Sequence, residues 1–146
     1  MIIVNFKAIE GRKYVSEIHV QQIQITNNMT ITNLTGENEN LTVSFVFTCD
    51  YVPGIGFIRL EGDITFNETK ENVQAAIKEW KESKGRHIYD RIVEKVHNLI
   101  LSNCFLEVAV ISKELRLPPP FPIPQIKKEN IENLEKEKEE AGRYIR

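Results

Sequence analysis

The first half of the chain alternates apolar and polar residues in the manner of β-strands. The clearest case is residues 58–66, in which every second position is apolar or glycine and the positions between are polar or charged. Residues 2–8, 18–31 and 41–49 follow the same period, the second of them in two phases. Because successive side chains of a strand point to opposite faces, this pattern predicts four strands of a sheet that buries one face.

Short polar stretches with turn-forming residues separate these segments. They lie at residues 10–12, 36–40 and 53–56, and we expect the chain to reverse at each. Strands joined by such short turns pair antiparallel, so we predict an antiparallel meander with one buried face and one partly solvated face. The change of phase in the second segment predicts a bulge or bend near Gln21 and Gln22.

After Asn67 the period of the apolar residues lengthens to that of a helix. The spacing i, i+3, i+4, i+7 is filled by Val73, Ala76, Ile77 and Trp80. Asn67 or Thr69 can cap the start of this helix, and Gly85 can end it.

A second helix is predicted to start near residues 86–88. Its apolar stripe includes Ile92, Val96 and Ile100. The stripe could continue through residues 105–111, but this run is also compatible with a strand or an extended segment, and we favour a helix that ends near Cys104.

Proline is concentrated in one place. Five of the six prolines fall in the run Leu117–Pro124. Proline fixes φ and lacks a backbone donor, so this run can be neither helix nor central strand. We expect an extended ribbon whose apolar residues, Leu117, Phe121 and Ile123, pack on the domain, in preference to a disordered ligand for proline-recognising modules.

The remaining residues are mostly charged. Residues 127–146 combine Lys and Glu with a thin apolar stripe, which fits either a short docked helix or a solvated tail. The fold class that we predict is α+β. A four-stranded antiparallel meander sheet is followed by two helices packed on one face, an extended proline-rich segment and a charged C-terminal helix or tail. Residues 1–126 form one domain in this interpretation, and residues 127–146 the charged helix or tail.

Composition excludes several functional classes. The chain has 146 residues, 41% hydrophobic and 27% charged, which is typical of one soluble globular domain. A net charge of −2 argues against a nucleic-acid partner, and no apolar run approaches the ~20 residues that insertion into a membrane requires. The N-terminus has no signal-peptide pattern, so we expect a cytoplasmic protein in which Cys49 and Cys104 are free, buried thiols.

Catalytic and cofactor motifs are not found. No glycine-rich phosphate loop occurs, and the three histidines have no spacing that suits a metal, so we expect no metal and no cofactor. Four polar residues could still serve a small enzyme: the strand neighbours Glu61 and Asp63, and the pair Asp50 and Tyr51 at a strand end. The strand face that carries Glu61 and Asp63 looks solvated, and Asp50 with Tyr51 fits a polar strand end, so we expect no enzymatic activity.

Apolar residues also gather where a loop is expected. A peptide-binding groove is predicted from the residues around the third turn and those of the proline ribbon, namely Tyr51, Val52, Ile55, Phe57, Phe121 and Ile123. Aromatic walls beside an exposed strand edge bind an extended peptide by backbone pairing and loose side-chain pockets. A second small core or a subunit interface is the alternative interpretation of the same residues.

The order of elements resembles the SecB family of export chaperones. Residues 20–25 lead into the meander, residues 57–62 resemble the family's fourth strand, and residues 92–105 resemble the end of its long helix. Residues 109–124 are similar to its leucine-and-proline segment. The similarity spans about residues 15–126 and rests on pattern and order. It implies that residues 1–126 form a single SecB-like α+β domain.

The resemblance implies a function. It implies a homo-oligomer, a dimer or a dimer of dimers, that captures unfolded or nascent polypeptide without ATP and takes part in protein transport. The family's usual members are strongly acidic and use that surface to engage the export motor, whereas this chain is nearly neutral. A general holdase, or a dedicated chaperone for one partner such as an antitoxin, therefore fits better than a chaperone that docks to that motor. The second hypothesis is a regulatory protein with one dedicated partner, such as an antitoxin, and a small enzyme is the third.

Overall fold

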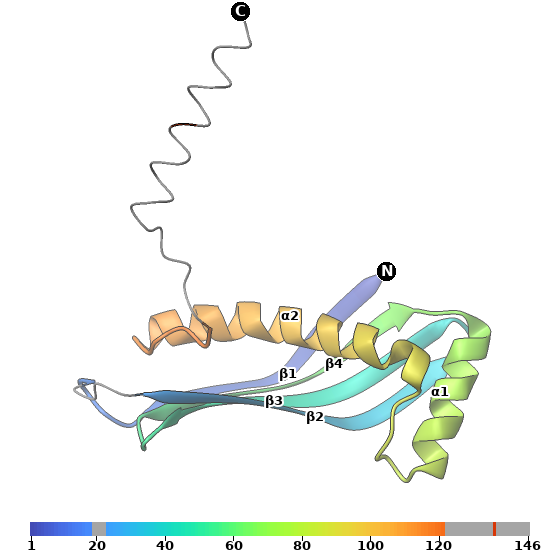
Figure 1. Ribbon diagram of the computed structural model, residues 1–146, viewed down its shortest axis with the longest axis horizontal. Helices are drawn as coiled ribbons and strands as arrows, with labels where there is room; N and C mark the ends of the chain where they lie inside the picture. The colour runs from blue at the N-terminus through green and yellow to red at the C-terminus, as the bar shows by residue number, and fades with distance from the viewer. Residues whose placement is uncertain (19–22, 122–135, 137–146) are drawn as a thin grey trace, which may run out of the picture.

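The computed structural model describes residues 1–18, 23–121 and 136. Six elements follow one another: β1 (Ile2–Lys13), β2 (Gln24–Glu37), β3 (Asn40–Val52), β4 (Gly56–Asn67), α1 (Lys70–Glu82) and α2 (Asp90–Glu114). All neighbouring strands are antiparallel, in the order β1-β4-β3-β2. A four-stranded antiparallel sheet followed by two helices is thus confirmed (Figure 1).

The strands β2, β3 and β4 follow one another as hairpins, and β1 lies on the far side of β4. The predicted turn at residues 10–12 is wrong, because β1 continues to Lys13. Gly11 is a packing glycine: a Cβ there would lie 2.9 Å from Leu115 Cδ1 and 3.0 Å from Ile111 Cγ2 of α2. The predicted bend at Gln21 and Gln22 lies outside the described residues.

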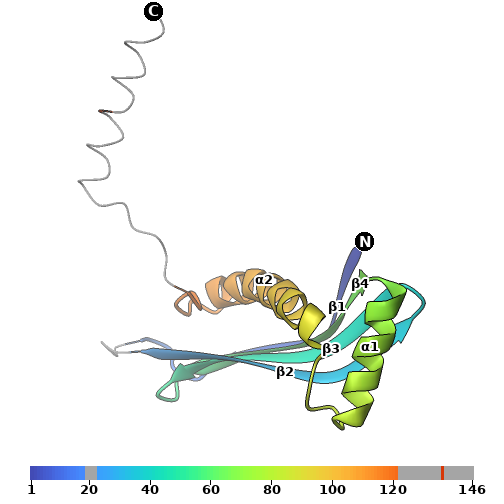
Figure 2. The same ribbon diagram turned by 45° about the vertical axis from the view of Figure 1, so that its right-hand side comes forward.

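One face of the sheet forms the core. In β3 and β4 every second residue is buried, and the register pairs these residues across the two strands, as in Val43 with Ile64 and Phe47 with Leu60. Both helices cover this face (Figure 2). The helix α2 lies along it, and α1 packs at one end, where a Cβ on Gly36 would meet Val73 Cγ1 at 2.7 Å.

The helix α2 is longer than predicted. It runs to Glu114, so the expected end near Cys104 is wrong and residues 105–111 are helical. Its buried residues recur every fourth position along the whole sheet: Ile92, Val96, Ile100, Cys104, Val108 and Ser112. Within the part of the chain that the structure describes, no helix has the length and hydrophobicity needed to cross a membrane.

Thr69 caps the start of α1, as predicted, where its Oγ1 accepts from the Asn72 backbone N–H at 3.3 Å.

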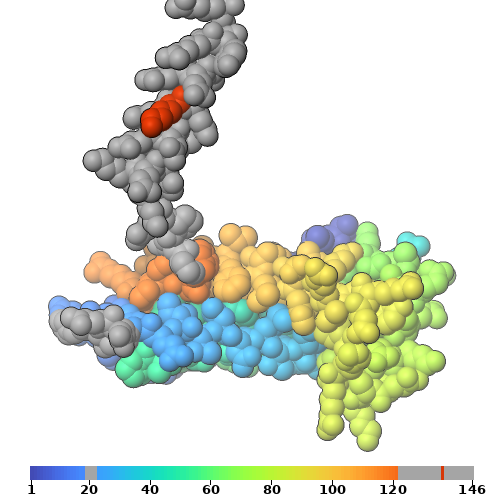
Figure 3. Space-filling view, in the orientation of Figure 1, coloured from blue at the N-terminus to red at the C-terminus, as the bar shows by residue number. Residues whose placement is uncertain are grey.

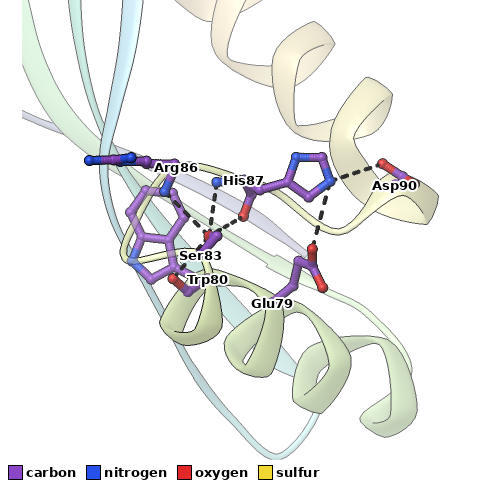
Figure 4. Close-up of polar contacts among 6 residues, drawn as sticks. All are labelled: Glu79, Trp80, Ser83, Arg86, His87 and Asp90. Atoms are coloured by element: carbon purple, nitrogen blue, oxygen red, sulfur yellow. Dashed lines mark hydrogen bonds and ion pairs between the residues drawn. The ribbon is translucent and has the colours of Figure 1, made fainter.

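A polar corner at the other end of α1 joins it to α2 (Figure 4). Beyond the end of α1, Ser83 Oγ accepts from the His87 N–H at 3.0 Å. His87 Nε2 lies 3.4 Å from Asp90 Oδ1, so the imidazole connects this corner to the start of α2. These contacts fix where α2 begins and therefore how it crosses the sheet.

Candidate peptide-binding surface

The proline segment is fastened to the sheet by two hydrogen bonds. Tyr51 Oη donates to the Pro118 carbonyl at 2.6 Å, and Asn27 Nδ2 donates to the Pro120 carbonyl at 3.3 Å. Leu117 is buried, as the sequence predicts, and its N–H donates to the Ser112 carbonyl at 2.8 Å. The segment thus lies on the same side of the sheet as α2.

Three phenylalanines lead from the core to the surface beside this segment. Phe47 is fully buried, and its ring centroid lies 5.6 Å from that of Phe105 on α2. The Phe105 ring in turn lies 5.9 Å from that of Phe121, which is 42% exposed. Both pairs meet edge to face, an arrangement that stabilises aromatic contacts beyond their buried area. The exposed ring is therefore held in place by the core.

The outer side of α2 adds two large apolar residues to the surface. Leu106 is 71% exposed and Val110, one turn later, is 55% exposed. Leu106 follows Phe105, the residue on which Phe121 rests. We call Phe121, Leu106 and Val110 the α2 apolar surface. The second half of α2 and the proline segment gather at one end of the molecule (Figure 3).

The residues predicted to line a groove fall into three groups. Tyr51 and Ile55 are buried, and Tyr51 holds the segment that carries Phe121. Val52 is 42% exposed at the end of β3. Phe57 follows the opposite phase to the buried residues of β4, so it lies on the face away from the helices, where its ring is 6.1 Å from that of Tyr14.

One predicted groove residue, Ile123, lies outside the described residues, as does the charged segment at residues 127–146. Leu106 and Val110 are additions that the prediction of the groove missed. The sequence does indicate them, because α2 has apolar residues on two sides. A helix with one buried face normally carries polar residues on the opposite face. Leu106 and Val110, which are four residues apart in the sequence, belong to this second apolar side.

Of the candidate catalytic residues, Tyr51 holds the proline segment, whereas Glu61 and Asp63 lie on the face of the sheet away from the helices. Glu61 pairs with Arg59 at 3.3 Å. Partial burial alone would raise the pKa of Asp63, but a hydrogen bond from Ser44 and the nearby Lys7 ammonium outweigh it and leave the pKa below its usual value. A carboxyl group that acts as a general acid needs the opposite shift. Burial, followed by the neighbouring Cys49, raises the pKa of Tyr51, so its hydroxyl stays a donor.

The two cysteines are free and buried, as predicted. Burial raises the pKa of Cys49 to about 11 and that of Cys104 to about 12. Because the thiolate is the reactive form, both thiols are inert at neutral pH. Among the described residues no cluster of three or more His, Cys, Asp or Glu side chains could hold a metal ion.

The chain matches no protein-family model, and no curated protein matches its sequence. A solved structure does match: the SecB-like chaperone Rv1957 of Mycobacterium tuberculosis in complex with a ChAD peptide from the Rv1956 HigA1 antitoxin. The two structures superpose with a TM-score of 0.57 over 88% of this chain and 91% of that chain, at 9% sequence identity. This chain has a SecB-like fold. The resemblance that the order of elements suggests is confirmed at the level of the fold.

The Tyr51 hydroxyl is expected to stabilise the SecB-like fold measurably. Tyr51→Phe leaves the ring in place and the Pro118 carbonyl without its donor, so we expect a loss of about 1–2 kcal/mol in the free energy of unfolding. Urea unfolding followed by circular dichroism measures it. Tyr14→Phe, at a ring that is 62% exposed, is the matched control. Equal unfolding midpoints for the two variants would show that the hydroxyl does not hold the segment.

Proposed function

We propose that the protein is a non-enzymatic, ATP-independent holdase that binds unfolded or nascent polypeptide in the cytoplasm. The observation that carries the proposal is the α2 apolar surface, in which Phe121, Leu106 and Val110 are 42%, 71% and 55% exposed, with the Phe121 ring in contact with the half-buried Phe105. The SecB-like fold supports it, because a chaperone with this fold holds a peptide from another protein.

The physical basis of capture is the burial of apolar surface. Unfolded chains expose apolar side chains that a folded protein would bury, and their transfer from water onto Phe121 and its neighbours is favourable without nucleotide. Covering about 300 Å² of apolar area contributes roughly 7 kcal/mol before the costs of association. Binding of this kind is reversible and depends little on client sequence.

Self-association is part of the proposal. A homo-oligomer, a dimer or a tetramer, is supported by further apolar residues on the edge strand β1, where Ile2, Ile3 and Ile9 are each at least half exposed. Side chains of this size in water favour contact with another protein surface. A second copy is the partner that is always present at the same concentration.

A dedicated chaperone is the second candidate function. The specific observation in its favour is that the SecB-like chaperone of similar structure holds a peptide from an antitoxin. In this version the α2 apolar surface receives one segment of one partner and leaves unrelated unfolded proteins alone. The net charge of the chain, −2, is far from the strongly acidic surface with which usual SecB proteins engage the export motor, so it also favours a different partner.

The test is the aggregation of a chemically unfolded protein. Guanidinium-unfolded citrate synthase is diluted into buffer with an equimolar amount of this protein, without nucleotide, and light scattering is followed. We expect strong suppression, and none from the same amount of serum albumin. Undiminished scattering in the presence of the folded protein would contradict the holdase and leave the dedicated chaperone as the better proposal.

A further inference from the structure

The two edges of the sheet differ in how well they are protected. An edge strand presents a row of unpaired backbone N–H and C=O groups, and proteins usually guard it with charges, prolines or bulges. The edge strand β1 has such guards: Lys7 lies at a bulge between Phe6 and Ala8, and Glu10, Arg12 and Lys13 follow. The other edge strand, β2, has no charged residue and no proline from Gln24 to Gly36.

The first part of β2 is regular and accessible. Within the described residues β2 pairs only with β3, and the register is unbroken from Gln24 opposite Val52 to Ile31 opposite Phe45. A bulge follows between Ile31 and Asn33, and α1 packs near the far end of the strand, at Gly36. Among the described residues, 24–31 therefore form a free edge of regular register, and β2 runs along the front of the molecule beneath α2 (Figure 3).

The flanks of this edge have different chemistry. On the helix side, Ile25, Met29 and Ile31 are partly buried against the core, and Asn27 donates to the Pro120 carbonyl of the proline segment. The opposite face of the same stretch is an exposed polar row made of Thr26, Asn28 and Thr30. A strand added here would place every second side chain on the apolar, helix side and the others on the polar face.

We propose that this protein takes a client segment as a fifth strand on the free edge of β2, at residues 24–31. The segment that fits is extended, free of proline and apolar at every second position. Its backbone pairs with β2, and its apolar side chains extend the surface that begins at Phe121. The proposal rests on the proposed function and specifies how the client is held. Backbone pairing explains how one site accepts many sequences, since every client carries the same amide groups.

Backbone pairing is tested on the wild-type protein. The probe is a short fluorescein-labelled peptide in which valine and threonine alternate between terminal lysines. Its counterpart has the same side chains but is N-methylated at each valine and threonine, which removes the donors. By fluorescence anisotropy we expect the methylated peptide to bind at least about tenfold more weakly. Equal affinities would overturn the proposal.

The position of the edge is tested with matched variants. Thr26→Lys places a charge along β2, and Asn5→Lys places one on the other edge strand. Both positions are exposed, and the net charge changes equally. We expect the β2 variant to lose affinity at least about tenfold and the β1 variant to stay within about twofold. Equal losses would overturn the assignment to β2.

Amide hydrogen exchange gives a second measurement that does not depend on a variant folding. On peptide binding, the outward amides of residues 24–31 are expected to exchange more slowly, and unchanged exchange there would count against the edge. The aggregation assay separates this proposal from the holdase itself. Suppressed aggregation with equal binding of both peptides overturns the edge alone, whereas no suppression and no peptide binding overturn both.

Discussion

Replacing Phe121 with aspartate is expected to weaken the binding of an unfolded polypeptide at least about tenfold, or 1.4 kcal/mol. The ring is 42% exposed and rests on Phe105, so it offers a client an apolar surface of fixed orientation. A carboxylate at this position would have to lose its hydration when an apolar client side chain covers it. Anisotropy titrations with labelled, reduced and carboxymethylated α-lactalbumin, which stays unfolded, measure the affinity.

The matched control for this experiment is Phe57→Asp. It makes the same substitution and the same change in charge on the face of the sheet away from the helices. The sequence alone assigns Phe57 and Phe121 to one groove, whereas the structure puts them on opposite faces. We expect Phe57→Asp to bind as the wild type does. If it loses affinity and Phe121→Asp keeps it, clients bind the outer face of the sheet.

A valine in place of Gly62 is expected to destabilise the fold by about 3 kcal/mol. Gly62 pairs with Phe6 of β1 on one side and Phe45 of β3 on the other, and the two rings meet edge to face at 6.2 Å. A Cβ at this position would lie 2.4 Å from the Asn5 carbonyl oxygen and 3.0 Å from Phe6 Cα. Because both neighbours are backbone atoms, relief requires that β1 move away from β4.

Urea unfolding measures this loss, and Glu61→Ala is the control. Glu61 is the preceding residue of β4, on the half-exposed face, so its truncation should change the free energy of unfolding by less than about 0.5 kcal/mol. A Gly62→Val variant as stable as this control would mean that β1 contributes little to the sheet. In that case the first strand would be a detachable edge.

The alternation of the sequence predicted the strands well where one face is fully buried. Residues 41–49 and 58–66 alternate strictly because β3 and β4 are the two central strands under α2. The pattern carries no information on partners, so it could not show that β1 joins β4. At Gly11 the turn signal misled, because that glycine makes room for Leu115 of a helix about a hundred residues later.

The candidate site was less accessible to sequence reasoning for two physical reasons. Apolar residues such as Leu106 usually indicate burial. Because residues 105–111 are apolar on more than one side, they were also compatible with a strand, and the helix was expected to end before them. The contacts that position Phe121 are long-range, from Asn27 and Tyr51 to carbonyls of the proline segment. Hydrogen bonds to backbone carbonyls leave no pattern in the side-chain sequence.

The unequal sheet edges also determine how far copies of this protein can polymerise. A stack of strands grows without limit only when one edge joins a different edge on the next molecule. Lys7 and the adjoining bulge make β1 a poor acceptor, so two molecules that pair through β2 use the same edge on both sides. Such pairing closes at two molecules. Edge pairing through β2 alone is therefore expected to give a dimer, and no fibril, at high concentration.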